Sequence, residues 1–164
     1  MEEKFYRACK DGKVEEVQRL LQNEQINVNW KNQSNYLRTP LYVACEEGHV
    51  EIVKLLLNDK RIDVNKIKNN DGTTPFWIAC WKEQINIVKL LVNDERVDIN
   101  KASNDGWTPF LIGCDYGKTE VVKYMLESGR EIDINKKDKY EKTGLDYAKE
   151  KGNTDIVKLL ESFQ

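Results

Sequence analysis

The sequence is poor in the segments and residues on which membrane proteins and secreted proteins depend. No uninterrupted apolar run approaches the ~18 residues that a bilayer-spanning helix needs. The first residues, MEEKFYRACK, form no apolar segment of the kind that precedes a secretory cleavage site. We therefore expect no membrane association and a cytoplasmic location, with the nucleus left open.

The sequence also lacks an excess of charge of either sign. The chain has 26 basic and 28 acidic residues, which gives a formal net charge of −2, and the two signs are interspersed. Nucleic-acid-binding domains carry a basic patch or stripe that meets the phosphates. The sequence predicts no nucleic-acid partner, and its 40% hydrophobic residues predict a folded chain.

Residues for catalysis are equally scarce. His49 is the only histidine, so a catalytic triad built on an imidazole has no second candidate. The nine glycines are isolated turn positions rather than a phosphate-binding loop. The sequence predicts no enzyme and no cofactor.

The four cysteines are Cys9, Cys45, Cys80 and Cys114, and none belongs to a C-x-x-C pair that would indicate zinc. They recur at one register of a repeated phrase. Stacked helices lie ~8–10 Å apart, whereas a disulfide needs Cα atoms within ~7 Å. We expect four free thiols, buried or half-buried, and no metal site.

What the sequence does contain is a phrase repeated roughly every 35 residues. TPLYVACEEGHVEIVKLLL begins at Thr39, altered copies begin at Thr74, Thr108 and Thr143, and a degenerate copy begins at Glu2. A second phrase, INVN, IDVN, VDIN or IDIN, follows each of the first four copies. We expect one domain over 1–164 made of five units, approximately 1–38, 39–73, 74–107, 108–142 and 143–164.

Each unit predicts two short helices and an extended hairpin. In the second unit, Thr39 is a good N-cap and the proline after it suits the first helical position. The first helix is expected over about 40–47, before Gly48, and the second over about 50–57. The following IDVN alternates apolar and polar residues, as an extended segment does. One such unit cannot bury its own apolar face, so the units must stack.

The phrases TPLYVA, TPFWIA and TPFLIG, the Gly48-His49 turn and the D-[VI]-N hairpins together resemble the ankyrin repeat. The resemblance spans the whole chain and implies an all-α ankyrin-repeat solenoid of helix-turn-helix units with extended hairpin loops. Arg7 and Lys149 place charges where inner copies have apolar residues, which is typical of capping units. We therefore expect a complete array.

Two departures from the family pattern carry expectations. The histidine of the family phrase is replaced by Tyr42, Trp77, Leu111 and Asp146, so its hydrogen bond to the capping threonine is expected to be absent. Glu83 stands where the helix-ending glycine belongs, and a left-handed backbone there predicts strain of ~1–2 kcal/mol.

The resemblance places partner binding on the concave face formed by the first helices and hairpin tips. Trp81 aligns with Glu46 and Asp115, which indicates a solvent-facing position that the fold does not require to be aromatic. The expected partner-binding residues are Tyr42, Glu46, Glu47, Trp77, Trp81, Lys82, Trp107, Asp115 and Tyr116. An aromatic patch beside acidic residues favours a partner with basic groups. The alternative is that Trp77 packs under the hairpin and Trp107 on its own loop.

These features predict a non-enzymatic adaptor that binds a protein or peptide as a monomer. The alternative is a structural scaffold whose aromatic patch closes a homodimer. Asn65 and Asn100 also resemble hairpin asparagines that are hydroxylated in some ankyrin repeats, so both are candidate modification sites.

Overall fold

The computed structural model describes residues 1–68 and 71–163, and within them ten helices form and no β-strand does. The helices are α1 (Glu2–Lys10), α2 (Val14–Leu21), α3 (Pro40–Glu47), α4 (Val50–Asn58), α5 (Pro75–Trp81), α6 (Ile85–Val92), α7 (Pro109–Asp115), α8 (Thr119–Glu127), α9 (Gly144–Lys151) and α10 (Thr154–Ser162). Each unit expected from the sequence contains one pair of these helices. The expected all-α architecture is confirmed.

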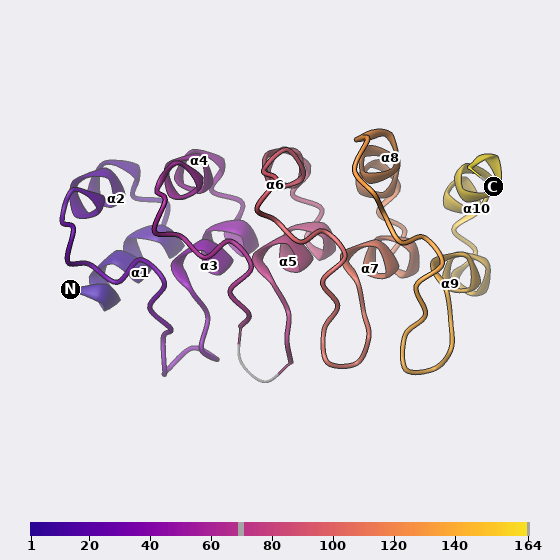
Figure 1. Ribbon diagram of the computed structural model, residues 1–164, viewed down its shortest axis with the longest axis horizontal. Coiled ribbons are helices and arrows are strands. Elements are labelled where there is room, and N and C mark those ends of the chain that lie inside the picture. Colours follow the sequence, from indigo (N-terminus) through magenta and orange to yellow (C-terminus); the bar gives the residue numbers. More distant parts are fainter. Residues whose placement is uncertain (69–70, 164) are drawn as a thin grey trace.

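The helices lie in two parallel rows, with the hairpins projecting beyond one of them (Figure 1). The odd-numbered helices α1 to α9 form the row next to the hairpins, and each packs on the following one. The even-numbered helices α2 to α10 form the other row in the same way. Equivalent residues of successive units therefore lie side by side along the stack.

Threonine caps begin four of the odd-row helices. The hydroxyls of Thr39, Thr74 and Thr108 each accept the backbone N–H three residues later, and a proline follows each cap. Thr143 caps α9 in the same way, but its hydroxyl also donates to Asp146 Oδ2 at 2.7 Å. In this last unit Asp146, which stands at the position of the family histidine, bonds the capping threonine in its place and completes a capping box.

The core is continuous along the stack because the odd-row helices of the first four units bury the same register position. Phe5, Leu41, Phe76 and Phe110 are equivalent residues of successive units, and all are buried in one hydrophobic cluster. The even-row helices contribute buried aliphatic residues such as Leu56 to the same cluster. No unit has a separate core, as expected for stacked repeats.

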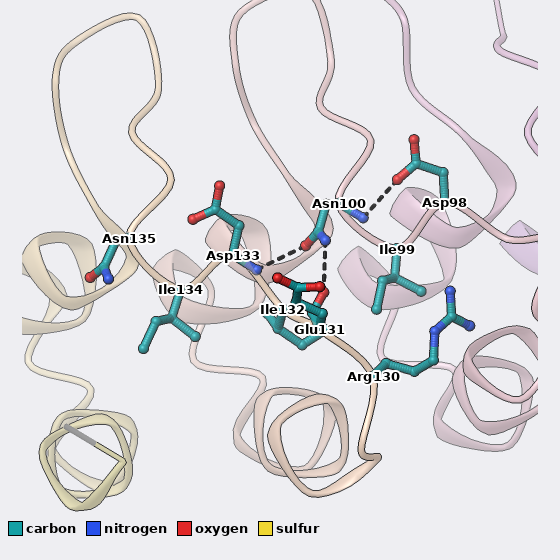
Figure 2. Close-up of a pocket in the computed structure, with 9 residues that line it drawn as sticks. All are labelled: Asp98, Ile99, Asn100, Arg130, Glu131, Ile132, Asp133, Ile134 and Asn135. Atoms are coloured by element: carbon teal, nitrogen blue, oxygen red, sulfur yellow. Dashed lines mark hydrogen bonds between the residues drawn. The ribbon is translucent and has the colours of Figure 1, made fainter.

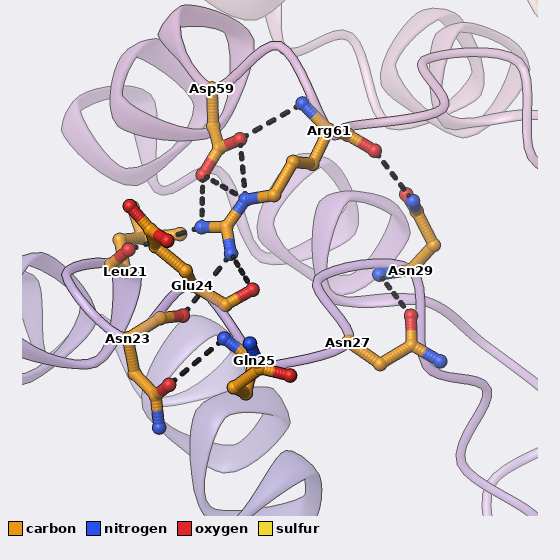
Figure 3. Close-up of polar contacts among 8 residues, drawn as sticks. All are labelled: Leu21, Asn23, Glu24, Gln25, Asn27, Asn29, Asp59 and Arg61. Carbon is orange, nitrogen blue, oxygen red and sulfur yellow. Dashed lines mark hydrogen bonds and ion pairs between the residues drawn. The ribbon is translucent and has the colours of Figure 1, made fainter.

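An arginine after α4 joins the second unit to the first. Arg61 Nη1 donates to the carbonyls of Asn23 at 3.1 Å and Glu24 at 3.0 Å, and Nη2 donates to that of Leu21 at 3.0 Å (Figure 3). Its guanidinium also pairs with Asp59 at 2.6 Å, which orients it. Hydrogen bonds from Arg61 keep the pKa of the Asp59 carboxyl below its usual range. The arginine thus supplies donors to carbonyls at the end of α2, which the helix leaves without partners.

Two further arginines make the same kind of contact farther along. Arg96 Nη2 donates to the carbonyl of Leu57 at 2.6 Å. Arg130 lies one register position earlier, yet its guanidinium donates to the carbonyls of Val92, Asp94 and Val97. Each of these three junctions is bridged from a hairpin back to the preceding unit.

An asparagine in each of the first four hairpin phrases occupies one register position, and the first three bridge to the next unit. The side chain of Asn29 donates to the carbonyl of Arg61 at 2.7 Å and accepts the N–H of Asp63 at 2.8 Å. Asn65 makes the same pair of bonds to Arg96 and Asp98, and Asn100 makes them to Glu131 and Asp133. We call these three residues the asparagine ladder. It fixes the spacing of consecutive hairpins.

Glu83 has the left-handed backbone that the sequence predicts, with φ of 56° where the equivalent Gly48 has 82°. Glu83→Gly is expected to raise the free energy of unfolding by about 0.5–1 kcal/mol. Glycine relieves the strain that the Glu83 side chain suffers on a left-handed backbone. This gain in stability exceeds the two losses, which are an exposed ion pair to Lys118 and the greater conformational entropy of the unfolded chain. Urea denaturation measures the change, and Glu47→Gly, within helix α3, is a control expected to lower stability. A loss of stability in Glu83→Gly contradicts the interpretation.

The four cysteines are free and buried. Burial raises the pKa of the Cys114 thiol to about 12, and it also raises the pKa values of the Cys9, Cys45 and Cys80 thiols. Since the thiolate is the reactive form, we expect a water-soluble disulfide reagent at pH 8 to react about 100-fold more slowly with the native protein than with the urea-unfolded one. Rapid labelling of the native protein contradicts this.

Candidate functional site

Three aromatic rings from two neighbouring units meet on the odd helix row. Trp77 and Trp81 lie one turn apart on α5, with ring centroids 5.6 Å apart at 56°. Tyr116, at the end of α7, meets Trp81 edge to face at 6.1 Å and 71°. Such tilted contacts are favoured between aromatic rings. We call Trp77, Trp81 and Tyr116 the aromatic cluster.

The outer part of the cluster is open to solvent. The Trp81 side chain is 37% exposed and Tyr116 is 53% exposed. Lys82 is exposed, and its ammonium lies 5.2 Å above the Trp81 ring, so this ring accepts a cation. The predicted solvent-facing position of Trp81 is thus what the structure has.

The inner part of the cluster is tied to a hairpin. Trp77 is partly buried, and its indole N–H donates to the carbonyl of Trp107 at 3.0 Å. Trp107 is partly buried too, and its ring packs on Tyr147 of the next unit at 4.7 Å. These contacts match the alternative weighed for Trp77, whereas Trp107 packs on the following unit rather than on its own loop. Trp77 therefore packs against Trp81 and exposes only part of its own ring to solvent.

Tyr42 does not join the exposed cluster, contrary to the site expected from the sequence. Its side chain is 1% exposed, and its hydroxyl lies 3.5 Å from Thr73 Oγ1. Register alone could not distinguish Tyr42 from Trp77, because the smaller ring fits beneath the hairpin. Lys68 and Arg38 lie over its ring at 5.7 Å and 5.9 Å.

The carboxylates beside Trp81 are mostly occupied within the chain. The Glu46 side chain is 13% exposed and pairs with Arg38 at 3.1 Å. The Asp115 side chain is 11% exposed, with the Lys151 ammonium 3.8 Å away. Of the three acidic residues predicted to bind a partner, only Glu47 is exposed and therefore accessible to a basic group of that partner. The acidic attraction expected from the sequence is therefore weaker than three free carboxylates would provide.

A pocket of about 570 Å³ lies at the base of the last two hairpins. It is lined by Asp98, Ile99, Asn100 and the segment from Arg130 to Asn135 (Figure 2). Asn100 bonds across it to the following hairpin, as Asn65 does one unit earlier. The side-chain amides of Asn65 and Asn100 are thus both held in hydrogen bonds to the next hairpin, and the hydroxylation of these residues stays a prediction.

Several polar contacts between units were not expected from the sequence. The arginines and the asparagine ladder recur with the repeat, and that recurrence was the only available signal. His49, interpreted as a turn residue, places Nε2 2.8 Å from the carbonyl of Lys10 in the preceding unit. Asn153 donates to the carbonyls of Cys114 and Asp115 in an equivalent way. These residues hold units together rather than carrying chemistry.

The comparison with protein families agrees with this geometry. A family described as ankyrin repeats, in three copies, matches residues 5–103 and 95–162. The chain belongs to the ankyrin repeat family. A search of curated proteins finds no match to it.

Ankyrin repeats are protein–protein interaction modules built on a non-catalytic fold, so protein partners follow from the family. Within the part of the chain that the structure describes, none of the helices has the length and apolar character needed to cross a membrane. Among the same residues, no group of histidine, cysteine or acidic side chains could hold a metal ion. The family does not identify the partner, so the surface residues must indicate what kind of partner binds.

Proposed function

We propose that this ankyrin repeat protein is a non-enzymatic adaptor that binds a protein partner through its odd helix row and hairpin tips. Trp81 and Tyr116 serve as the anchors. The observation that carries the proposal is the exposure of two aromatic side chains, in edge-to-face contact, at positions that other units fill with charged residues. Interface hot spots are enriched in such aromatic anchors surrounded by polar groups.

The support beneath Trp81 favours binding over mere exposure. Trp77 is fixed by its hydrogen bond to the Trp107 carbonyl. Trp81 packs on Trp77, and Tyr116 packs on Trp81. Rings held in place lose little conformational freedom when a partner covers them. A rigid aromatic surface is therefore available without rearrangement.

The charge around the anchors suits a partner that combines an apolar group with one basic group. Glu47 is open to accept a basic side chain, whereas Glu46 and Asp115 lie near cations of their own chain. We expect burial of apolar surface to supply most of the affinity and salt to weaken binding only modestly.

The test compares wild type with Trp81→Ala/Tyr116→Ala in affinity capture from the native cell's lysate. The matched control is Phe163→Ala, which removes an exposed aromatic side chain just after α10, in the other helix row. We expect one partner to bind wild type and the control but not the cluster variant. With that partner purified, calorimetry should show at least about 30-fold weaker binding to the cluster variant.

Two outcomes would count against the proposal. Retention of the same partners by the cluster variant would place recognition on another surface. Concentration-dependent dimerisation of wild type in sedimentation experiments, lost in the cluster variant, would favour the homodimeric scaffold instead.

A further inference from the structure

The exposed residues beside the aromatic cluster follow one another in a fixed order along the stack. Glu47, Lys82 and Tyr116 stand at one register of the second, third and fourth units. Glu47 ends α3, Lys82 follows α5 and Tyr116 follows α7. All three are exposed. Because α3 packs on α5 and α5 packs on α7 (Figure 1), the odd helix row presents a negative charge, a positive charge and an aromatic ring in succession.

The two charged residues of this row are free to pair with a partner. Glu46 and Asp115, at the neighbouring register of the same units, both form ion pairs within the chain. Among the residues that the structure describes, none forms an ion pair with Glu47 or Lys82. The ammonium of Lys82 lies 5.2 Å above the Trp81 ring, beside the exposed aromatic surface. A partner can therefore pair with both charges without breaking an ion pair of the protein.

The spacing of the units sets the spacing that a partner needs. Helices that pack side by side lie ~8–10 Å apart, so Glu47, Lys82 and Tyr116 succeed one another at about that interval. An extended chain advances ~3.3 Å per residue, so its every third residue advances about 10 Å. An extended segment laid along the odd helix row therefore presents every third side chain to the next unit.

We propose that the partner binds the odd helix row with an extended segment that carries a basic, an acidic and an apolar side chain, in that order, at every third position. The basic side chain pairs with Glu47 and the acidic one with Lys82. The apolar one packs on the exposed rings of Trp81 and Tyr116. This inference rests on the proposed function, because it uses the same aromatic anchors, and it adds the charge order that the site recognises.

The order of the two charges decides which segments bind. A segment with its basic and acidic residues exchanged has the same net charge, but it brings like charges to Glu47 and Lys82 when its apolar residue lies on the rings. If that segment runs in the opposite direction, the charges pair but the apolar residue leaves the rings. Like charges at a contact disfavour the wrong partner. Exposed ion pairs are individually weak, so they supply selectivity while the rings supply affinity.

The experiment titrates the protein with two acetylated and amidated heptapeptides of identical composition, KSSESSL and ESSKSSL. Nuclear magnetic resonance follows the indole N–H of Trp81 and the ring of Tyr116. We expect KSSESSL to bind with a dissociation constant in the millimolar range, and ESSKSSL to bind at least about 3-fold more weakly. Raising the salt concentration from about 20 mM to about 500 mM should reduce this difference, because salt screens exposed charges.

An exchange of charges in the protein tests the same order from the other side. Glu47→Lys/Lys82→Glu keeps the net charge and changes two exposed side chains. In this variant the preference should reverse, so that ESSKSSL binds at least about 3-fold more tightly than KSSESSL. The matched control is Glu120→Lys/Lys123→Glu, which exchanges two exposed charges on α8 in the even helix row. The control should keep the preference of the wild type.

Three results would overturn the proposal. They are no shift of either ring up to about 10 mM KSSESSL, equal affinity of the two peptides for the wild type at low salt, or an unchanged preference in Glu47→Lys/Lys82→Glu. If any of these occurs while Trp81→Ala/Tyr116→Ala still loses the native partner, the charge order is wrong and the proposed function stands. Retention of the native partner by that variant would instead overturn the proposed function, and this inference with it.

Discussion

Replacing Arg61 with alanine is expected to lower the free energy of unfolding by about 2–3 kcal/mol. The guanidinium is the donor for three backbone carbonyls of the preceding unit, those of Leu21, Asn23 and Glu24. Its loss also leaves the largely buried Asp59 carboxylate without its partner. Urea denaturation followed by circular dichroism measures the change.

The loss of stability in Arg61→Ala should be confined to one part of the stack. In a stack, stability is approximately a sum of units and nearest-neighbour interfaces. Arg61 spans only the first junction, so α1 and α2 should lose hydrogen-exchange protection while α7 to α10 keep theirs. Lys60→Ala, an exposed neighbour, is the control and should change neither quantity. Uniform loss of protection, or none, would contradict the role assigned to Arg61.

The effect of Arg61 should also depend on pH. The pKa of Asp59 is lowered in the folded protein because Arg61 hydrogen-bonds the carboxylate. A lowered folded pKa stabilises the protein above the unfolded value, about 3.9 for aspartate. That contribution disappears as the pH falls through the folded value. The difference in stability between wild type and Arg61→Ala should therefore narrow below about pH 4.

The sequence predicts the fold well because its apolar positions recur. A residue such as Phe76 has an equivalent in every unit, and a buried role shared by several copies is difficult to misread. The same comparison identified Trp81, since a tryptophan among equivalents such as Glu46 and Asp115 departs from the pattern. Periodicity therefore predicts which face each side chain occupies.

Periodicity does not predict which polar groups meet across two units. That depends on the offset between stacked units and on backbone carbonyls, which no residue letter reports. Arg61 reaches α2, and Asn100 reaches the hairpin of the next unit, only because the units stack at the observed spacing. The burial of Tyr42 was missed for a related reason, because the hairpin that covers it belongs to the same unit's variable loop. Contacts between a side chain of one unit and the backbone of another could be identified only from the structure.

Phe76→Ala and Trp81→Ala are expected to differ greatly in their effects on stability, although both remove an aromatic side chain from α5. Phe76 is 1% exposed in the continuous core, so its removal leaves a cavity and should cost about 3–5 kcal/mol. Trp81 is 37% exposed and loses mainly its contacts with Trp77 and Tyr116. Its replacement should cost about 1 kcal/mol or less.

Urea denaturation of the two variants beside wild type measures both losses. A loss above about 3 kcal/mol in Trp81→Ala would make Trp81 a core residue and remove the main support for the aromatic cluster as a binding surface. A small loss, with Phe76→Ala strongly destabilised, would mean that the fold does not depend on this tryptophan. Its exposed ring is then free to be covered by a partner, and the free energy of that contact is available to binding rather than already used in folding.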